Sequence, residues 1–158
     1  MDWADGDALA STERHLRLMV RGREDETLKR WGAGCPALGE AGLTGPAEVK
    51  GWLRTLPTRA ADAVLGRLVG HAQGGDSPAL LTVIACLEPG IRNLAARSSV
   101  TTAEAVSEIA LGILDYPLDR RTSVAGGLLL DARNRMYRAA QRAARSEPFD
   151  DDDASHPP

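Results

Sequence analysis

The sequence predicts an all-α fold, a compact multi-helix bundle of four to six helices. Apolar residues recur at intervals of three and four along several stretches, which places them on one side of a helix. Aromatic residues make up only 4% of the 158 residues, so the core must be built from Leu, Val, Ile and Ala. No stretch shows the apolar–polar alternation of a half-buried strand. A chain of this length is expected to form one domain.

Residues 1–57 are predicted to form an N-terminal helical extension. One helix is expected from Leu9 to Arg23, because apolar residues fall on one side of it. Residues 32–46 are rich in glycine and are expected to be a loop. A short helix should begin at Pro46, since proline suits a first turn, and should end before Pro57.

Residues 58–145 are predicted to form the main helical domain. Its first helix is expected to be capped by Thr58 and to reach Ala72. After a glycine-rich turn follows the most regular apolar stripe in the chain, which predicts a single core helix ending near Arg97. Pro89 should kink this helix, because proline removes one backbone hydrogen bond. The members of the stripe are Leu80, Ile84, Leu87, Ile91 and Leu94.

A helix is expected to start at Thr101. Thr101 and Glu104 have the spacing of a capping box, in which a hydroxyl and a carboxylate satisfy the first free backbone N–H groups. Tyr116 should end the helix, because a residue that precedes proline is pushed out of helical geometry.

The last predicted helix runs to about Arg145, with Thr122 or Ser123 as its cap. Advancing about 100° per residue, its apolar residues fill one arc, and a row of arginines lies nearly opposite. Such a row can follow a run of phosphates; a solvated helix face is the alternative. The arc holds Ala125, Leu128, Leu129, Ala132, Met136, Ala139 and Ala143. The row holds Arg135, Arg138, Arg142 and Arg145.

Charge and composition exclude several classes of protein. The net charge of −3 argues against indiscriminate nucleic-acid binding by the whole surface. Basic residues nevertheless concentrate between Arg120 and Arg145. Residues 146–158 include four successive aspartates and two final prolines, and are predicted to be an acidic disordered tail.

Further observations predict a cytoplasmic protein that is not an enzyme and uses no metal or cofactor. Cys35 and Cys86 have neither metal-site nor redox spacing and fit a reducing cytosol. The three histidines have no partner at metal-ligand spacing. No nucleophile is paired with a base. No secretory signal is evident, and no stretch approaches the about 20 apolar residues of a membrane helix.

A series of short motifs runs in order from Ala72 over roughly half of the chain. It consists of Ala72-Gln73-Gly74-Gly75-Asp76, Leu80 through Leu87 with Pro89, Leu94-Ala95 with Arg97, Ala105-Val106-Ser107-Glu108-Ile109 with Leu111, and Leu128 with Asp131-Ala132-Arg133-Asn134. In this order and spacing the motifs resemble region 2, the conserved helical core domain of bacterial sigma factors. The resemblance implies an entry turn, then a helix that docks on the RNA polymerase clamp, then a promoter-reading helix.

The chain departs from the sigma-factor pattern at three places. The last helix begins with Gly126-Gly127, where the family carries aromatic residues that stack on unpaired bases. Ser107 stands where the clamp-facing helix usually has an amide. The second DNA-binding domain, a helix-turn-helix, is missing. What the resemblance implies is therefore a degenerate sigma-like protein that binds RNA polymerase, promoter DNA or both, and positions rather than opens the duplex. The alternative is a protein–protein interaction module, such as a regulator or decoy, without DNA binding.

Two sets of candidate site residues follow from this hypothesis. Arginine holds phosphates, and Asn, Gln and Arg can form paired hydrogen bonds to base edges. The predicted DNA-binding residues are Arg120, Arg121, Asn134, Arg135, Arg138, Gln141, Arg142 and Arg145. Acidic residues around a leucine suit a basic helix of a partner. The predicted partner-binding residues are Glu104, Glu108, Leu111 and Asp115.

Overall fold

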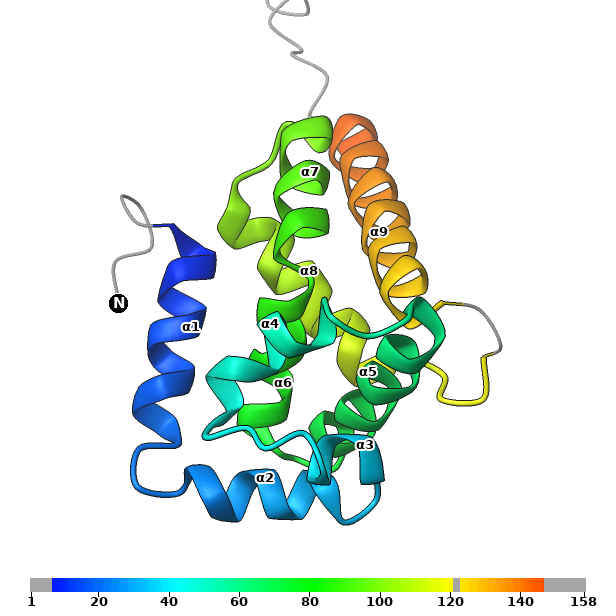
Figure 1. Cartoon of the computed structure of the whole chain (residues 1–158). Helices are drawn as coiled ribbons and strands as arrows, with labels where there is room; N and C mark the ends of the chain where they lie inside the picture. Colours follow the sequence, from blue (N-terminus) through cyan, green and yellow to red (C-terminus); the bar gives the residue numbers. More distant parts are fainter. Residues whose placement is uncertain (1–6, 121–122, 147–158) are drawn as a thin grey trace, which may run out of the picture.

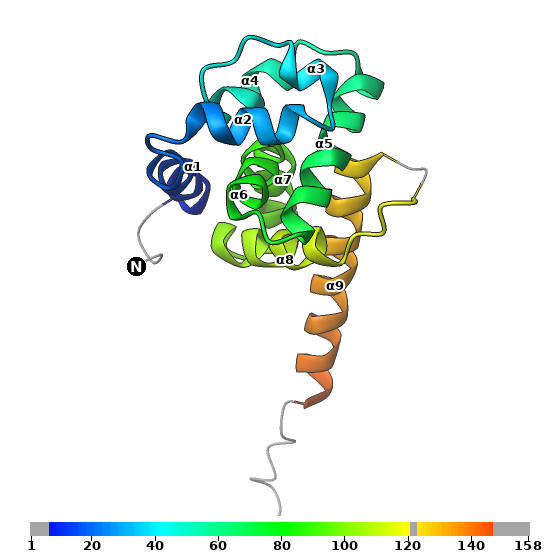
Figure 2. The ribbon, with the colours of Figure 1, turned by 90° about the horizontal axis from the view of Figure 1, so that it is seen from below.

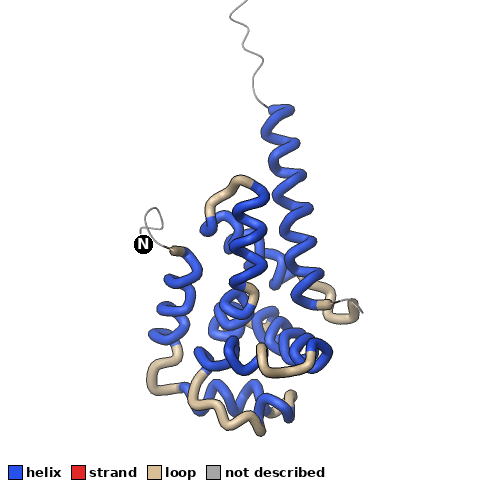
Figure 3. The backbone as a smooth tube through the Cα atoms, turned by 45° about the horizontal axis from the view of Figure 1, so that its top comes forward, coloured by secondary structure: helices blue, strands red, loops and turns tan. Residues whose placement is uncertain are grey.

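A computed structural model describes residues 7–120 and 123–146, and every regular element in these two ranges is a helix (Figures 1 and 3). The predicted all-α class is confirmed, but the expected number of four to six helices was too low, since the described ranges contain nine α-helices. The elements are α1 (Ala8–Met19), α2 (Glu24–Gly32), α3 (Pro36–Gly39), η1 (Pro46–Glu48), α4 (Val49–Leu53), α5 (Thr58–Gln73), α6 (Ser77–Cys86), α7 (Glu88–Ser98), α8 (Thr102–Asp115) and α9 (Val124–Ser146). The predicted tail beyond Ser146 lies outside the described residues.

The N-terminal extension contains a helix that the sequence analysis missed. The first helix ends at Met19 rather than Arg23, and Gly22 turns the chain at a φ of +79°. Helix α2 then begins with three acidic residues and ends with two basic ones, an order that complements the helix dipole. The predicted loop also contains the single-turn helix α3.

Trp31 and Asp76 tie the extension to the main domain. Trp31 is buried, and its Nε1 donates a hydrogen bond to Oδ2 of Asp76 at 2.9 Å. The same carboxylate forms an ion pair with Arg30 at 3.0 Å and caps α6 by accepting from the backbone N–H of Ala79 at 3.2 Å. One continuous apolar cluster includes buried residues of both parts, so the extension shares the core of the bundle.

The predicted core helix is two helices, α6 and α7, whose directions differ by 69°. The chain breaks at Leu87, and Pro89 lies in the first turn of α7, where its missing N–H breaks no helical hydrogen bond. The prediction of a single kinked helix was therefore wrong, because the chain forms two separate helices here. In the described part of the chain no single helix is long and apolar enough to cross a membrane. The bent pair of α6 and α7 together has the length and apolar composition of a membrane span.

Helices α8 and α9 begin and end close to their predicted limits. Thr101 Oγ1 accepts a hydrogen bond from the backbone N–H of Glu104 at 3.1 Å, and α8 ends at Asp115. Ser123 Oγ caps α9 by accepting from the N–H of Gly126 at 3.2 Å, whereas Thr122 lies outside the described residues.

Only the first half of α9 packs on the body. Its buried residues are Val124, Leu128 and Ala132, and it contacts α5, α7 and α8. Every residue from 137 to 146 is exposed, including Ala139 and Ala143, which were predicted to extend the apolar arc. Figure 2 shows this half of α9 extending away from the other helices.

Candidate nucleic-acid interface

Three arginines lie in the exposed half of α9. Arg138, Arg142 and Arg145 are exposed and form no ion pair with other residues of the described ranges. They follow one another at intervals of four and three, so all three lie on one side over about 10 Å of helix. No acidic residue follows Asp131 in α9. Within the described ranges, this part of α9 therefore presents three guanidinium groups without an acidic partner.

Two amide side chains accompany these arginines. Asn134 and Gln141 are exposed, as a base-reading role requires. Gln141 Nε2 donates a hydrogen bond to the hydroxyl of Tyr137 at 3.0 Å, which orients its amide along the helix. Tyr137 itself is 65% exposed, and it borders a hollow between α7 and α9 together with Asn134 and Arg97.

Arg135 does not belong to the exposed row, so its predicted outward position was wrong. Its Nη1 donates a hydrogen bond to the backbone carbonyl of Glu108 in α8 at 3.1 Å. The side chain lies over Gly112, where an added Cβ would come within 3.0 Å of that nitrogen. Glycine at position 112 thus makes room for a tie between α8 and α9, and Arg135 is half-buried.

Arg120, a predicted nucleic-acid contact, is exposed and also interacts within the chain. Its Nη1 lies 2.9 Å from Oδ2 of Asp131. Its guanidinium carbon lies 5.1 Å from the centroid of the Tyr116 ring, which is a cation–π geometry. Arg121 lies outside the described residues.

Tyr116 explains Gly127, the second glycine of the pair at the start of α9. The ring is only 4% exposed, and an added Cβ on Gly127 would lie 3.1 Å from both its Cε2 and its hydroxyl oxygen. The hydroxyl is buried and has no hydrogen-bond partner among the described residues. Gly127 therefore accommodates an aromatic ring from the α8–α9 connection. From the sequence, this position was recognised only by its lack of aromatic residues; the close approach of the Tyr116 ring accounts for a glycine that otherwise weakens the helix.

The predicted partner-binding residues lie together on the outer side of α8. Glu104, Leu111 and Asp115 are exposed, and Glu108 is half-buried. Leu111 is 53% exposed, and the neighbouring Leu114 is 47% exposed. Leu114 therefore enlarges this surface. We refer to these five residues as the α8 surface.

The described residues contain no group of three His, Cys, Asp or Glu side chains that could hold a metal ion. Burial raises the pKa of the Cys86 thiol to about 12, so it stays protonated near neutral pH. Cys35 is buried.

No protein-family model, no curated protein and no solved structure matches the chain, so no relative lends it a function.

Proposed function

We propose that the protein is a transcription-associated DNA-binding protein that uses α9 to follow the phosphate backbone, in the manner that its resemblance to sigma-factor region 2 implies. The observation that carries the proposal is the trio Arg138, Arg142 and Arg145 on a bare helix. Phosphate neutralisation by arginine releases counterions and supplies most of the sequence-independent affinity for DNA. Residues 137–146 are all exposed in the part of the chain that the structure describes, so a duplex can approach them without rearrangement of the bundle.

The amides set the orientation of the helix on the duplex. The major groove of B-DNA admits an α-helix, and Asn or Gln can form two hydrogen bonds with adenine there. Asn134 and Gln141 lie next to the arginine side of α9, so the helix could hold phosphates and reach base edges at once. The ring of Tyr116 fills the space beside Gly127, and glycine offers no side chain on which an unpaired base could stack. The protein therefore binds a closed duplex.

Titration of fluorescently labelled duplex DNA against salt tests this proposal. Three free arginines predict a slope of log affinity against log salt near −2.7, from about −0.9 per contact. A slope near zero would reject DNA binding by α9. Charge reversal at Arg138 and Arg142 should abolish most of the affinity, whereas reversal at the exposed residues Arg14 and Arg59 of α1 and α5 should leave it unchanged.

The α8 surface supports a second function, docking on RNA polymerase or another protein. Two exposed leucines flanked by carboxylates suit a partner helix that has apolar and basic residues. Co-purification with core RNA polymerase tests it. Changing Glu104 and Glu108 to Lys should abolish retention, and changing the exposed Asp25 and Glu40 to Lys should not. Retention that survives the first pair of changes would exclude the α8 surface as the docking site.

A further inference from the structure

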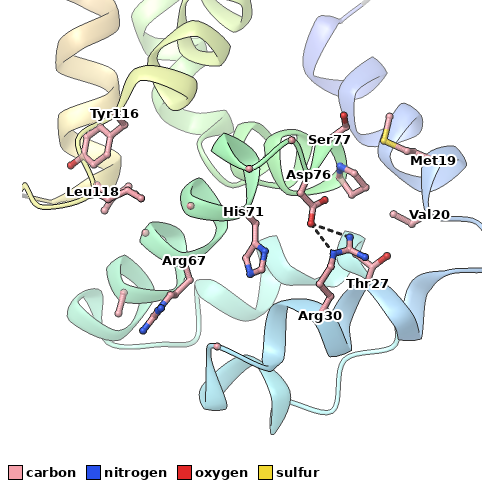
Figure 4. A pocket seen from close by; sticks show the side chains of 18 of the residues that line it. Met19, Val20, Thr27, Arg30, Arg67, His71, Asp76, Ser77, Tyr116 and Leu118 are labelled. Carbon is pink, nitrogen blue, oxygen red and sulfur yellow. Dashed lines mark hydrogen bonds and ion pairs between the residues drawn. The ribbon is translucent and has the colours of Figure 1, made fainter.

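A groove elsewhere in the molecule is lined by neither the α9 arginines nor the residues of the α8 surface. It has a volume of about 1020 Å³ and lies between α5 and the N-terminal extension. Figure 4 shows Met19, Val20 and Arg30 of the extension toward one end, Arg67 and His71 of α5 in the middle, and Tyr116 and Leu118 at the other end. The groove thus joins the extension, which has no assigned role, to the main domain.

The groove is basic, and its charges come from separate parts of the chain. Arg23, Arg30, Arg67 and Arg120 line it, against the carboxylates of Glu26 and Asp76. Asp76 is fully used by the hydrogen bonds that join the extension to α6. Arg23 and Arg67 are exposed and form no ion pair with any residue that the structure describes. Two guanidinium groups in the groove are therefore free for an external carboxylate.

One wall of the groove contains a row of glycines at α5. Gly66 and Gly70 lie in the helix and Gly74 is its C-cap residue, and their intervals of four place them along one side of it. Internal packing does not require the first two. An added Cβ on Gly66 or Gly70 would lie 3.7 Å from the nearest side-chain atom, of Val124 or Leu118, which is an ordinary contact. Neither has a left-handed φ.

Gly66 and Gly70 destabilise α5 relative to alanine, and no close contact within the described residues requires them. Small residues let another backbone approach a helix closely. Exposed apolar side chains border the same groove, since Leu118 is 55% exposed and Met19 is 38% exposed. The combination of free arginines, glycine row and apolar rim fits a peptide better than a polyphosphate, which would need neither glycines nor leucine.

We propose that this groove binds an acidic amphipathic helix of a partner protein, with its apolar side on the α5 glycines and its carboxylates on Arg23 and Arg67. The Gly66–Gly74 row spans about 12 Å, so the bound segment is about two to three helical turns long. The site is independent of DNA binding by α9.

The test uses the full chain and a series of fluorescein-labelled peptides. Each peptide is an amphipathic helix of about three turns with glutamates and with Leu or Phe anchors at varied positions; a matched series carries lysines for the glutamates. Anisotropy titration is expected to show binding of at least one acidic peptide and none of the lysine series. Changing both Arg23 and Arg67 to Glu should weaken binding at least about tenfold, whereas the same change at Arg14 and Arg59 should have no effect.

The glycine row provides a second test with opposite readouts. Changing Gly66 and Gly70 to Ala is expected to raise the melting temperature by about 2–4 °C per substitution, because alanine favours the helix, and yet to weaken peptide binding about tenfold. Unchanged binding in the alanine or the Glu variants, binding of no acidic peptide, or equal binding of the lysine series would each overturn the proposal.

A parallel titration with duplex DNA separates this site from the proposed function. The Arg23 and Arg67 changes should leave DNA affinity intact, and changes at Arg138 and Arg142 should leave peptide affinity intact. Loss of DNA affinity through Arg23 and Arg67, without an effect on the peptides, would make the groove a nucleic-acid site and refute a peptide site.

Discussion

Arg135 Nη1 donates a hydrogen bond to the backbone carbonyl of Glu108 at 3.1 Å and so joins α9 to α8. This contact divides the four arginines of the predicted row into one structural residue and three free ones. Removal of Arg135 by an alanine substitution is expected to lower the free energy of unfolding by about 1.5–3 kcal/mol, since the donor is charged and half-buried. Urea denaturation followed by circular dichroism measures the change.

The same variant should leave the salt dependence of DNA binding near −2.7, whereas Arg138→Ala should reduce the magnitude of the slope by about 0.9 without affecting stability. A slope near −3.6 in the wild type, or a fall in slope with Arg135→Ala, would show that Arg135 reaches the phosphates after all.

Gly127→Ala is expected to destabilise the protein although alanine is the better helix former. The new Cβ would lie 3.1 Å from the ring of Tyr116, so the ring or α9 must shift, which costs about 1–3 kcal/mol. Gly126→Ala is the matched control. Its Cβ would meet only Ser123, at 3.5 Å, and it should raise the free energy of unfolding by up to about 1 kcal/mol. Equal effects of the two substitutions would argue against close packing of Tyr116 on α9.

Tyr116→Phe is expected to stabilise the fold by about 1 kcal/mol, because it removes a buried hydroxyl that has no partner among the described residues. The aromatic ring, its contact with Gly127 and its stacking with Arg120 all remain. Tyr116→Ala should instead lower the free energy of unfolding by about 3–5 kcal/mol through the cavity it leaves. A loss of stability in the Phe variant would indicate that the hydroxyl is hydrogen-bonded.

Glu88 is expected to make the free energy of unfolding depend on pH in the acidic range. The hydrogen bond from Lys50 Nζ, with that from Arg92, holds the pKa of its carboxyl below the ordinary value of 4.5. Because the pKa is lower in the folded than in the unfolded chain, the stabilisation is complete above the ordinary pKa and is lost as the pH falls through the folded pKa. The free energy of unfolding should therefore decline below about pH 5.

Glu88→Gln should reduce this decline, and Glu40→Gln should not, since Glu40 is exposed and forms no ion pair within the described ranges. Urea titrations at several pH values between neutral and strongly acidic provide the comparison. Parallel pH profiles for the wild type and the Glu88 variant would exclude a contribution from this network.

Elements with local signals were predicted well. Helix α8 combines a cap at Thr101, an apolar stripe and a stop at Pro117, all of which are encoded within the element. Helix α2 was missed because the two residues it buries, Thr27 and Trp31, form no apolar stripe. The partner of Trp31 is Asp76, 45 residues away, and no local pattern encodes that contact.

The candidate site shows the same limit. Arg135 and Arg138 are the same residue type in one predicted row, and helical periodicity alone cannot separate them. What separates them is Gly112 on the neighbouring helix, which leaves space for one side chain only. Helical periodicity did predict which polar residues of α9 are exposed, because their spacing places them on the side opposite the apolar arc. These residues are Asn134, Arg138, Gln141, Arg142 and Arg145.

The exposed end of α9 also has a consequence for local stability. Helices α5, α7 and α8 contact the first half of α9, whereas its last ten residues, about 15 Å of helix, are all exposed. Helical turns without packing are marginally stable on their own. The rate of backbone amide hydrogen exchange should consequently increase from Ala132 toward Ser146. A ligand that binds the exposed end should slow this exchange along α9.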